Sequence, residues 1–483
     1  MDVTDTDRDV WVQRNSADLI AEFDRSLVPF LRQRDGQLRR RVRAKEVARL
    51  VDRVLDPFQE LPQLLDPHLS KFIPILAEAY LELLQDHRKS RGLSTRTELL
   101  MPMPNAICRL LYAFCKIRGE KVIVRFLNVE TRYLELLLFA LEGSEKGNAE
   151  TEEPQHSESW TWHERYVVLL WLSQLFFAPF DLSTISSGDF DDSERPVLPG
   201  LEWPAQIPGI TLRIIPLALK YLASPGKERD GAKTLLIRLA MRRDMQEVGI
   251  LKALVHWALH TLRPQAEGPT NTPYFYIGSL NFLAGVLQAA ADTSMMNALL
   301  SPIYYAVNGV SSDDNPTFAM IKGSALARKM MIKVIRSVTT LALRKAEQTM
   351  SDTEMVESSI GYLLEHLADN DTPVRLAASK ALSVITLKLE PDMALQVVEA
   401  VLESLNRNVL WVKNQSNPSG PRTRDLTSVD PLEWHGLMLT LSHLLYRRSP
   451  PPEILADIVQ ALVLGLAFEK RGNLGWFCRY QRS

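Results

Sequence analysis

Apolar residues recur at helical spacing along most of the chain, and the clearest case lies between residues 351 and 385. In its first half, apolar residues from Val356 to Leu367 stand at offsets of 0, 4, 7, 8 and 11, which places them on one face of a helix. A similar stripe runs from Val374 to Ile385. Neither helix can bury its stripe alone, so the pattern predicts a stack of helical hairpins in which each hairpin needs neighbours.

The ends of these two helices carry start signals. Ser351 followed by Glu354 predicts a capping box for the first helix. Thr372 followed by Pro373 predicts an N-cap with proline at the first helical position of the second. The chain between the helices is a short polar turn, as expected for a tight hairpin.

Helix after helix is expected elsewhere, with almost no alternating strand pattern. The repeat length of about 35 to 45 residues is nearest to the HEAT type, and only residues 351–387 carry its sequence pattern clearly. Within that unit we expect Asp371 and Arg375 to tie the turn to the first helical step, not to touch a partner. The predicted fold class is all-α, a HEAT/armadillo-like helical-repeat solenoid.

The interruptions of the periodic pattern predict the organisation of the chain. We expect single helices over 37–55, 245–262 and 320–345. The expected segments are N-terminal helical repeats (1–142), an acidic flexible loop (143–158), an apolar helix and turn (159–181), a polar connection (182–209), HEAT-like repeats (210–410), a polar loop (411–431), a further helical repeat (432–472) and an atypical tail (473–483).

Composition narrows the class of protein. Hydrophobic residues make up 46% of the chain, charged residues 24%, and the net charge is -2, so nothing pulls the whole protein toward nucleic acid or an anionic membrane. The longest apolar run, 166–180, is about 15 residues, short of a membrane span. Three cysteines and a polar N-terminus without a leader pattern favour a reduced, cytosolic protein.

Residues 226–234 contain the nearest match to a phosphate-binding loop. That loop needs G-x-x-x-x-G-K-[ST] directly after a strand, so that backbone amides wrap the phosphates. Here Ala232 stands between Gly231 and Lys233, and an amphipathic helix precedes the segment. An ordinary helical segment is therefore the better interpretation.

No other group of residues in the sequence forms a recognisable catalytic or metal-binding site. His256 and His260 are four residues apart, as metal ligands can be, but no H-E-x-x-H pattern or neighbouring ligand completes a site. Cys108 and Cys115 fall on one apolar helix face, where cysteine acts as a small hydrophobe. We expect no catalytic residue, no bound cofactor and no metal.

Two clusters of basic residues remain as candidates for binding a partner. One lies in residues 32–45 and the other follows residue 115. A solvated helix face is the usual explanation, and a docking surface for an acidic protein is the sharper alternative; nucleic acid would call for interleaved aromatic residues. The candidate partner-binding residues are Arg39, Arg40, Arg41, Lys116, Arg118, Lys121 and Arg125.

An ordered series of motifs carries a family resemblance over roughly residues 55 to 472. The central one is W-x-x-R-Y, then L-L-W-L-S, then P-F-D, within 162–181. Others are Leu64–Leu69, Lys116–Gly119, Arg229–Ala232, Arg243-Asp244, Gly285–Ala289, Asp371–Arg375, Trp434–Gly436 and Glu469–Gly472. The series resembles the tubulin-folding cofactor D family, also called tubulin-specific chaperone D.

That resemblance implies a non-catalytic chaperone without ATPase activity, located in the cytoplasm and on the microtubule cytoskeleton. It implies binding of β-tubulin, assembly and disassembly of the α/β-tubulin heterodimer, and stimulation of tubulin GTP hydrolysis together with cofactors C and E. An Arf-like small GTPase is a further implied partner. The alternative is a generic helical-repeat scaffold in transport or signalling.

The sequence departs from the family at its end. Members of the family continue with further helical repeats, whereas here the match stops after Gly472. The tail also lacks the polar capping helix that a solenoid end requires. We therefore expect the chain to be the N-terminal part of a longer protein.

Overall fold

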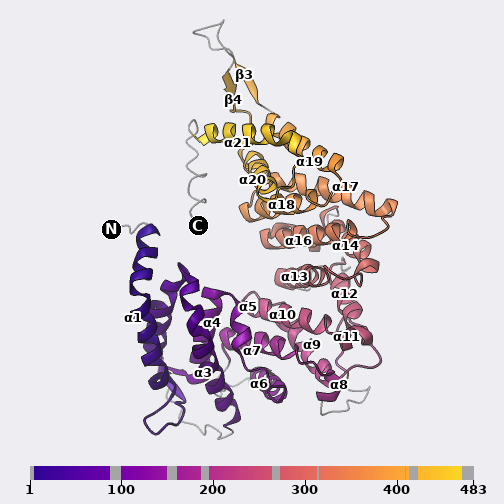
Figure 1. The fold of residues 1–483 in the computed structure, drawn as a ribbon. Helices are drawn as coiled ribbons and strands as arrows, with labels where there is room; N and C mark the ends of the chain where they lie inside the picture. The colour runs from indigo at the N-terminus through magenta and orange to yellow at the C-terminus, as the bar shows by residue number, and fades with distance from the viewer. Residues whose placement is uncertain are drawn as a thin grey trace. The chain divides into compact units, whose positions relative to one another are not determined.

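Helices dominate the fold in the computed structural model of the protein (Figure 1). The structure describes residues 5–86, 99–149, 160–185, 195–263, 272–312, 315–407, 409–412 and 423–469. They fall into two compact units, Met1–Leu254 and Val255–Ser483, whose boundary lies within helix α12 (Ile250–Thr261). The prediction of an all-α helical-repeat fold is confirmed.

The first unit is a succession of helices with one small ribbon. Its elements are α1 (Asp5–Leu31), β1 (Arg41–Arg43), α2 (Ala44–Ala48), η1 (Arg49–Leu55), η2 (Asp56–Gln59), η3 (Pro62–Leu65), α3 (Asp66–Gln85), β2 (Leu100–Pro102), α4 (Met103–Arg118), α5 (Glu120–Ile123), η4 (Val124–Phe126), α6 (Arg132–Ala149), α7 (Trp162–Leu175), α8 (Leu182–Ile185), α9 (Gly209–Leu222), α10 (Glu228–Ala240) and α11 (Arg243–Val248).

Helix α7 is the centre of the first unit, where it packs against α4, α6 and α10. Trp171 is fully buried and donates its indole N–H to the carbonyl oxygen of Asn128 at 2.7 Å. Gly231 lets α10 come close, because a Cβ there would lie 3.1 Å from Cβ of Leu169. The tryptophan and glycine of the sequence motifs are thus explained by packing.

The second unit continues in the same manner. Its elements are α13 (Pro273–Ala289), η6 (Asn297–Leu299), α14 (Leu300–Ser312), α15 (Pro316–Gly323), α16 (Ala325–Ala342), α17 (Met350–Glu365), η7 (His366–Ala368), α18 (Thr372–Thr386), α19 (Pro391–Asn406), β3 (Leu410–Val412), β4 (Thr423–Asp425), α20 (Pro431–Arg447), η8 (Pro452–Ile454) and α21 (Leu455–Glu469). Helices α13, α16, α18 and α20 pack one on the next.

Three helices expected to be continuous are broken. Residues 41–43 of the expected helix 37–55 form strand β1, which pairs antiparallel with β2. The expected helix 245–262 is divided at Gly249, which adopts a left-handed conformation with φ 97°. The expected helix 320–345 is divided at Ser324, whose hydroxyl accepts the N–H of Ala327 and starts α16.

Two expected loops contain regular structure. Helix α6 continues to Ala149, so the prediction of a loop from residue 143 is wrong for 143–149. Residues 150–158 of the predicted loop lie outside the described residues. Glu142 and Glu145 on this helix bond to Arg213 and Tyr221 of α9, which stabilises the extension. The expected loop 411–431 contains β4, paired with β3.

The caps of the hairpin helices differ from the prediction by one or two residues. The capping box of α17 is formed by Thr349 and Asp352, because Thr349 precedes the helix that Ser351 already belongs to. For α18 the N-cap is Asp371, and Pro373 is at the second helical position.

Among the described residues, no helix is both long and apolar enough to cross a membrane.

Candidate functional site

The first basic cluster lies on a turn and a strand, not on the helix face expected from the sequence. Gly36 turns the chain with φ 82°, and the amide of Met103 donates to the carbonyl oxygen of Arg40 at 2.8 Å. Arg40 lies 3.4 Å from Asp86, an exposed ion pair of little energetic weight. Arg40 and Arg41, consecutive residues at the start of the small ribbon, are both exposed, and Arg39 is half-buried.

The second basic cluster is at the other end of α4. Lys116 lies 3.3 Å from Asp56, and Arg118 donates to both carboxylate oxygens of Asp66 at 2.5 and 2.9 Å. The hydrogen bond from Arg118 lowers the pKa of Asp66. The bidentate pair holds Arg118 on Asp66, whereas the exposed pair of Lys116, like that of Arg40, has little energetic weight.

Lys121 and Arg125 are exposed and bond to no described side chain. Helix α4 has 16 residues and is therefore about 24 Å long. Since the ribbon contacts its first residue and Arg118 is its last, the two basic clusters do not form one patch. Arg40 pairs with Asp86, as Lys116 and Arg118 pair with their own carboxylates. Of the remaining candidates, Arg41, Lys121 and Arg125 are exposed and Arg39 is half-buried.

A turn after α7 is held by Arg242, a half-buried arginine. Arg242 donates to the carbonyl oxygens of Phe176, Ala178 and Phe180 at 2.7, 3.0 and 2.8 Å. It also pairs with Asp244 at 2.9 Å, and the side chains of this pair are only 9% and 12% exposed. Burial alone would raise the pKa of Asp244, but hydrogen bonds from Arg242 and the Leu182 amide lower it.

This turn displays two aromatic side chains. Phe177 is 55% exposed and Phe180 is 63% exposed. The guanidinium of Arg238 lies 3.5 Å from the ring centre of Phe177, a cation–π contact. Exposed aromatic residues on a rigid turn are typical of protein contact sites.

Asp371 and Arg375 have the structural role predicted for them. Arg375 is 5% exposed and donates to the carbonyl oxygens of Asp369 and Asn370 and to Nδ1 of His435. Asp371 accepts from Arg328 of α16 at 2.7 Å. The hairpin turn is therefore fixed to the helices before and after it.

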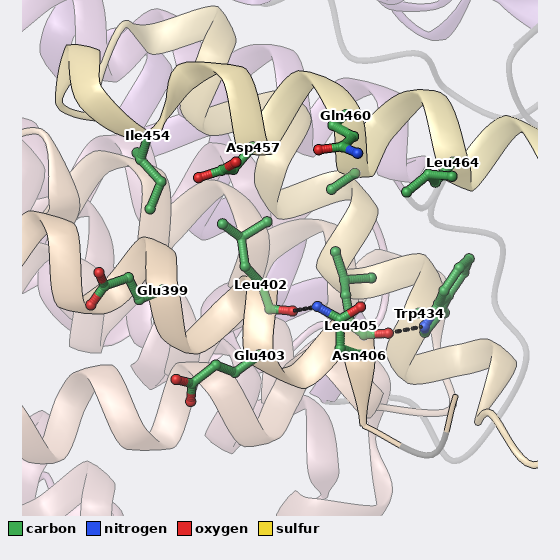
Figure 2. A pocket seen from close by; sticks show the side chains of 11 residues that line it. Glu399, Leu402, Glu403, Leu405, Asn406, Trp434, Ile454, Asp457, Gln460 and Leu464 are labelled. Carbon is green, nitrogen blue, oxygen red and sulfur yellow. Dashed lines mark hydrogen bonds between the residues drawn. The ribbon is translucent and has the colours of Figure 1, made fainter. Parts of the chain in front are cut away.

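The second unit contains a groove between α19, α20 and α21 (Figure 2). It encloses about 430 Å³. Trp434 donates its indole N–H to the carbonyl oxygen of Leu405 at 3.0 Å, which fixes α20 to the end of α19. The apolar residues that line the groove are Leu402, Leu405, Trp434, Ile454, Ala461 and Leu464. The sequence pattern does not reveal this groove, because its two walls come from separate helices and periodicity assigns their apolar residues to the core.

The described residues offer little for catalysis. No group of three or more histidine, cysteine or acidic side chains among them could hold a metal. Burial raises the pKa of the Cys108 and Cys115 thiols, which disfavours the nucleophilic thiolate. Residues 228–234 of the loop-like motif belong to helix α10, which follows helix α9. The arrangement can hold a partner by shape and charge.

Fold and surfaces together define a helical-repeat protein whose exposed features suit macromolecular contacts. Two family models match, the ARM repeat of tubulin-specific chaperone D-like proteins at residues 55–262 and their second ARM-repeat region at 322–415. Together these ranges cover more than half of the chain, in the order expected. The chain belongs to the tubulin-specific chaperone D family.

Two curated relatives agree with this assignment. Tubulin-folding cofactor D of Schizosaccharomyces pombe is 25% identical over 430 residues, which are 85% of this chain and 33% of that protein. Tubulin-specific chaperone D of Dictyostelium discoideum is 21% identical over 354 residues, which are 64% of this chain and 23% of that protein. The chain thus spans a third or less of the length of these relatives.

Proposed function

We propose that the protein is a tubulin chaperone that binds β-tubulin and takes part in assembly and disassembly of the α/β-tubulin heterodimer. The observation that carries this proposal is the ordered match of two family-specific repeat regions to residues 55–262 and 322–415. A repeat stack presents a long surface, which suits a folded protein as cargo. The names of both relatives point the same way.

The protein acts without chemistry of its own in this proposal. It stimulates GTP hydrolysis by tubulin only as part of a complex with tubulin-folding cofactors C and E, and an Arf-like small GTPase is a further partner. Its place is the cytoplasm and the microtubule cytoskeleton. The basic ribbon at Arg39, Arg40 and Arg41 supports the proposal, because tubulin is acidic and opposite charge favours encounter.

Retention of tubulin on the immobilised full chain tests the proposal. We expect purified β-tubulin to be retained and an acidic protein of similar charge, such as serum albumin, to wash off. Depletion of the protein in cells should lower the amount of intact tubulin dimer. A folded chain that retains no tubulin, or depletion that leaves dimer levels normal, would favour a generic scaffold.

A further inference from the structure

The groove of the second unit has walls of matching character along its length. On α21 the residues that line it are Asp457, Gln460, Ala461 and Leu464, spaced by three, one and three along one helix face. The wall spans eight residues from Asp457 to Leu464, which is seven helical steps, about 10 Å or two turns. Figure 2 shows Leu402 of α19 pointing toward this face.

The rim of the groove is acidic. Glu399 and Glu403 are four residues apart on α19, so they lie on one side of that helix, and Asp457 is on the opposite wall. All three are exposed, and none forms an ion pair with a described residue. No lysine, arginine or histidine is among the lining residues.

The end of helix α19 adds to this negative potential. Its last residue, Asn406, lies in the lining, and the C-terminal end of a helix carries partial negative charge. The nearest cation along the chain, Arg407, is directed to Glu433 at 3.8 Å. An apolar floor under a wholly acidic rim fits a ligand with an apolar stripe flanked by positive charges.

We propose that this groove binds a basic amphipathic helix of a protein partner. The occupant places two or three apolar side chains, spaced by three or four residues, against Leu402, Leu405 and Leu464. Its lysines or arginines pair with Glu399, Glu403 and Asp457. Such a ligand is opposite in charge to tubulin, so the site goes beyond the proposed function and serves a second class of partner.

The test uses the full chain and a fluorescent peptide of leucine and lysine, about 16 residues long so that it can form a helix. Fluorescence anisotropy should show saturable binding that weakens with salt. Combined Glu399→Gln, Glu403→Gln and Asp457→Asn should weaken binding about tenfold, since exposed ion pairs contribute modestly each. A matched control is Glu354→Gln, Glu357→Gln and Glu365→Gln on α17, which changes the net charge equally and should leave binding unchanged.

Filling the groove provides an independent readout. Ala461→Leu, at a half-buried position of the wall, should weaken binding without altering the charge, while circular dichroism verifies folding. Equal binding by the rim variant and its control would overturn the proposal, as would equal binding of a leucine–glutamate peptide.

The remaining possible occupants are the chain itself and a second copy. Gln460→Cys should react with a maleimide dye as fast as a cysteine at exposed Glu357, and the peptide should slow only the former. Protection of Cys at 460 without peptide, or dimerisation that buries it, would overturn the proposal. Loss of tubulin binding would leave these outcomes unaffected, so the two proposals fail independently.

Discussion

Gly436 of α20 is required for the close approach of two elements. A Cβ at this position would overlap the backbone carbonyl group of Leu367, and backbone cannot rotate away as a side chain can. Alanine normally stabilises a helix interior by about 0.5–1 kcal/mol over glycine. At Gly436 the cost of the steric overlap exceeds the gain in helix propensity. We therefore expect Gly436→Ala to lower the free energy of unfolding, measured by urea denaturation, by about 2 kcal/mol.

Gly361 is the matched control for that substitution. It is exposed in α17, and no heavy atom lies within 4 Å of the position its Cβ would take. Gly361→Ala should therefore raise the free energy of unfolding by a few tenths of a kcal/mol up to about 1 kcal/mol. Equal effects of both substitutions would show that the contact at Leu367 is not tight.

His163 should make stability depend on pH. Its ring stacks on Trp162 at 3.6 Å, and burial together with nearby Arg109 lowers its pKa from 6.5 to about 4. The folded state therefore takes up this proton less readily than the unfolded state. The contribution of His163 is fully present above about pH 6.5 and is lost as the pH falls toward 4.

The measurement compares the free energy of unfolding at about pH 7.5 and pH 5, where the folded and unfolded protonation states of His163 differ. His435 and His443 also have lowered pKa values from burial, so they add to the loss in the same direction. His163→Gln should reduce the loss without abolishing it. An unchanged pH dependence in that variant would contradict the assigned role.

At the scale of elements, Arg242 connects α11 to the turn that follows α7. Removing it leaves the carboxylate of Asp244, whose side chain is only 12% exposed, without its cation and three carbonyl oxygens without their donor. We expect Arg242→Ala to lower the free energy of unfolding by about 3 kcal/mol, as for other broken buried pairs. Chemical denaturation measures this directly.

The neighbouring Arg243 provides the control. Its side chain is 92% exposed, and among the described residues its ion pair is with Glu247, one helical turn away. Arg243→Ala should change the free energy of unfolding by less than about 0.5 kcal/mol. If both substitutions cost the same, the pair with Asp244 would have no special role.

The presence of helices could be predicted from sequence better than the points at which they are interrupted. Periodicity identified the helices around 351–385, since their apolar stripes are long and regular. It missed the break at Ser324, where the backbone is extended and the hydroxyl caps α16, because a single serine among apolar residues does not by itself mark a helix end. It also missed β1, whose partner strand lies about 60 residues away and leaves no local signal.

At the scale of the molecule, the net charge of -2 hides two local surfaces of opposite sign. The first unit carries the basic ribbon and the second the acidic groove. We expect combined Arg39→Ala, Arg40→Ala and Arg41→Ala to weaken tubulin binding severalfold, with a smaller salt dependence, because the local field attracts an acidic partner. Surface plasmon resonance at several salt concentrations measures both.

The control for this prediction removes three exposed cations from scattered positions, through Arg14→Ala, Lys252→Ala and Lys388→Ala. These three substitutions change the net charge as much as the ribbon substitutions do, but they leave the ribbon intact. Equal weakening by both sets would indicate a general charge effect. In that event the ribbon would not be the contact surface.

The candidate residues could be predicted from sequence only in part. Clusters of basic residues are visible in the chain, but their ion pairs are not: Asp66, which binds Arg118, is 52 residues away. The groove depends on how α19 and α21 approach each other, and sequence gives no distance between helices. Such surfaces emerge only when the packing is known.

The two buried cysteines of α4 make local opening of the first unit measurable, through the rate at which their thiols react. Cys108 and Cys115 are free thiols in its core, 0% and 9% exposed. An alkylating reagent therefore reaches them only when α4 separates from its neighbours, so the labelling rate reports how often that opening occurs. With Cys478→Ser as background, mass spectrometry would show whether a bound client slows this opening, and thereby whether clients bind the closed or the open form.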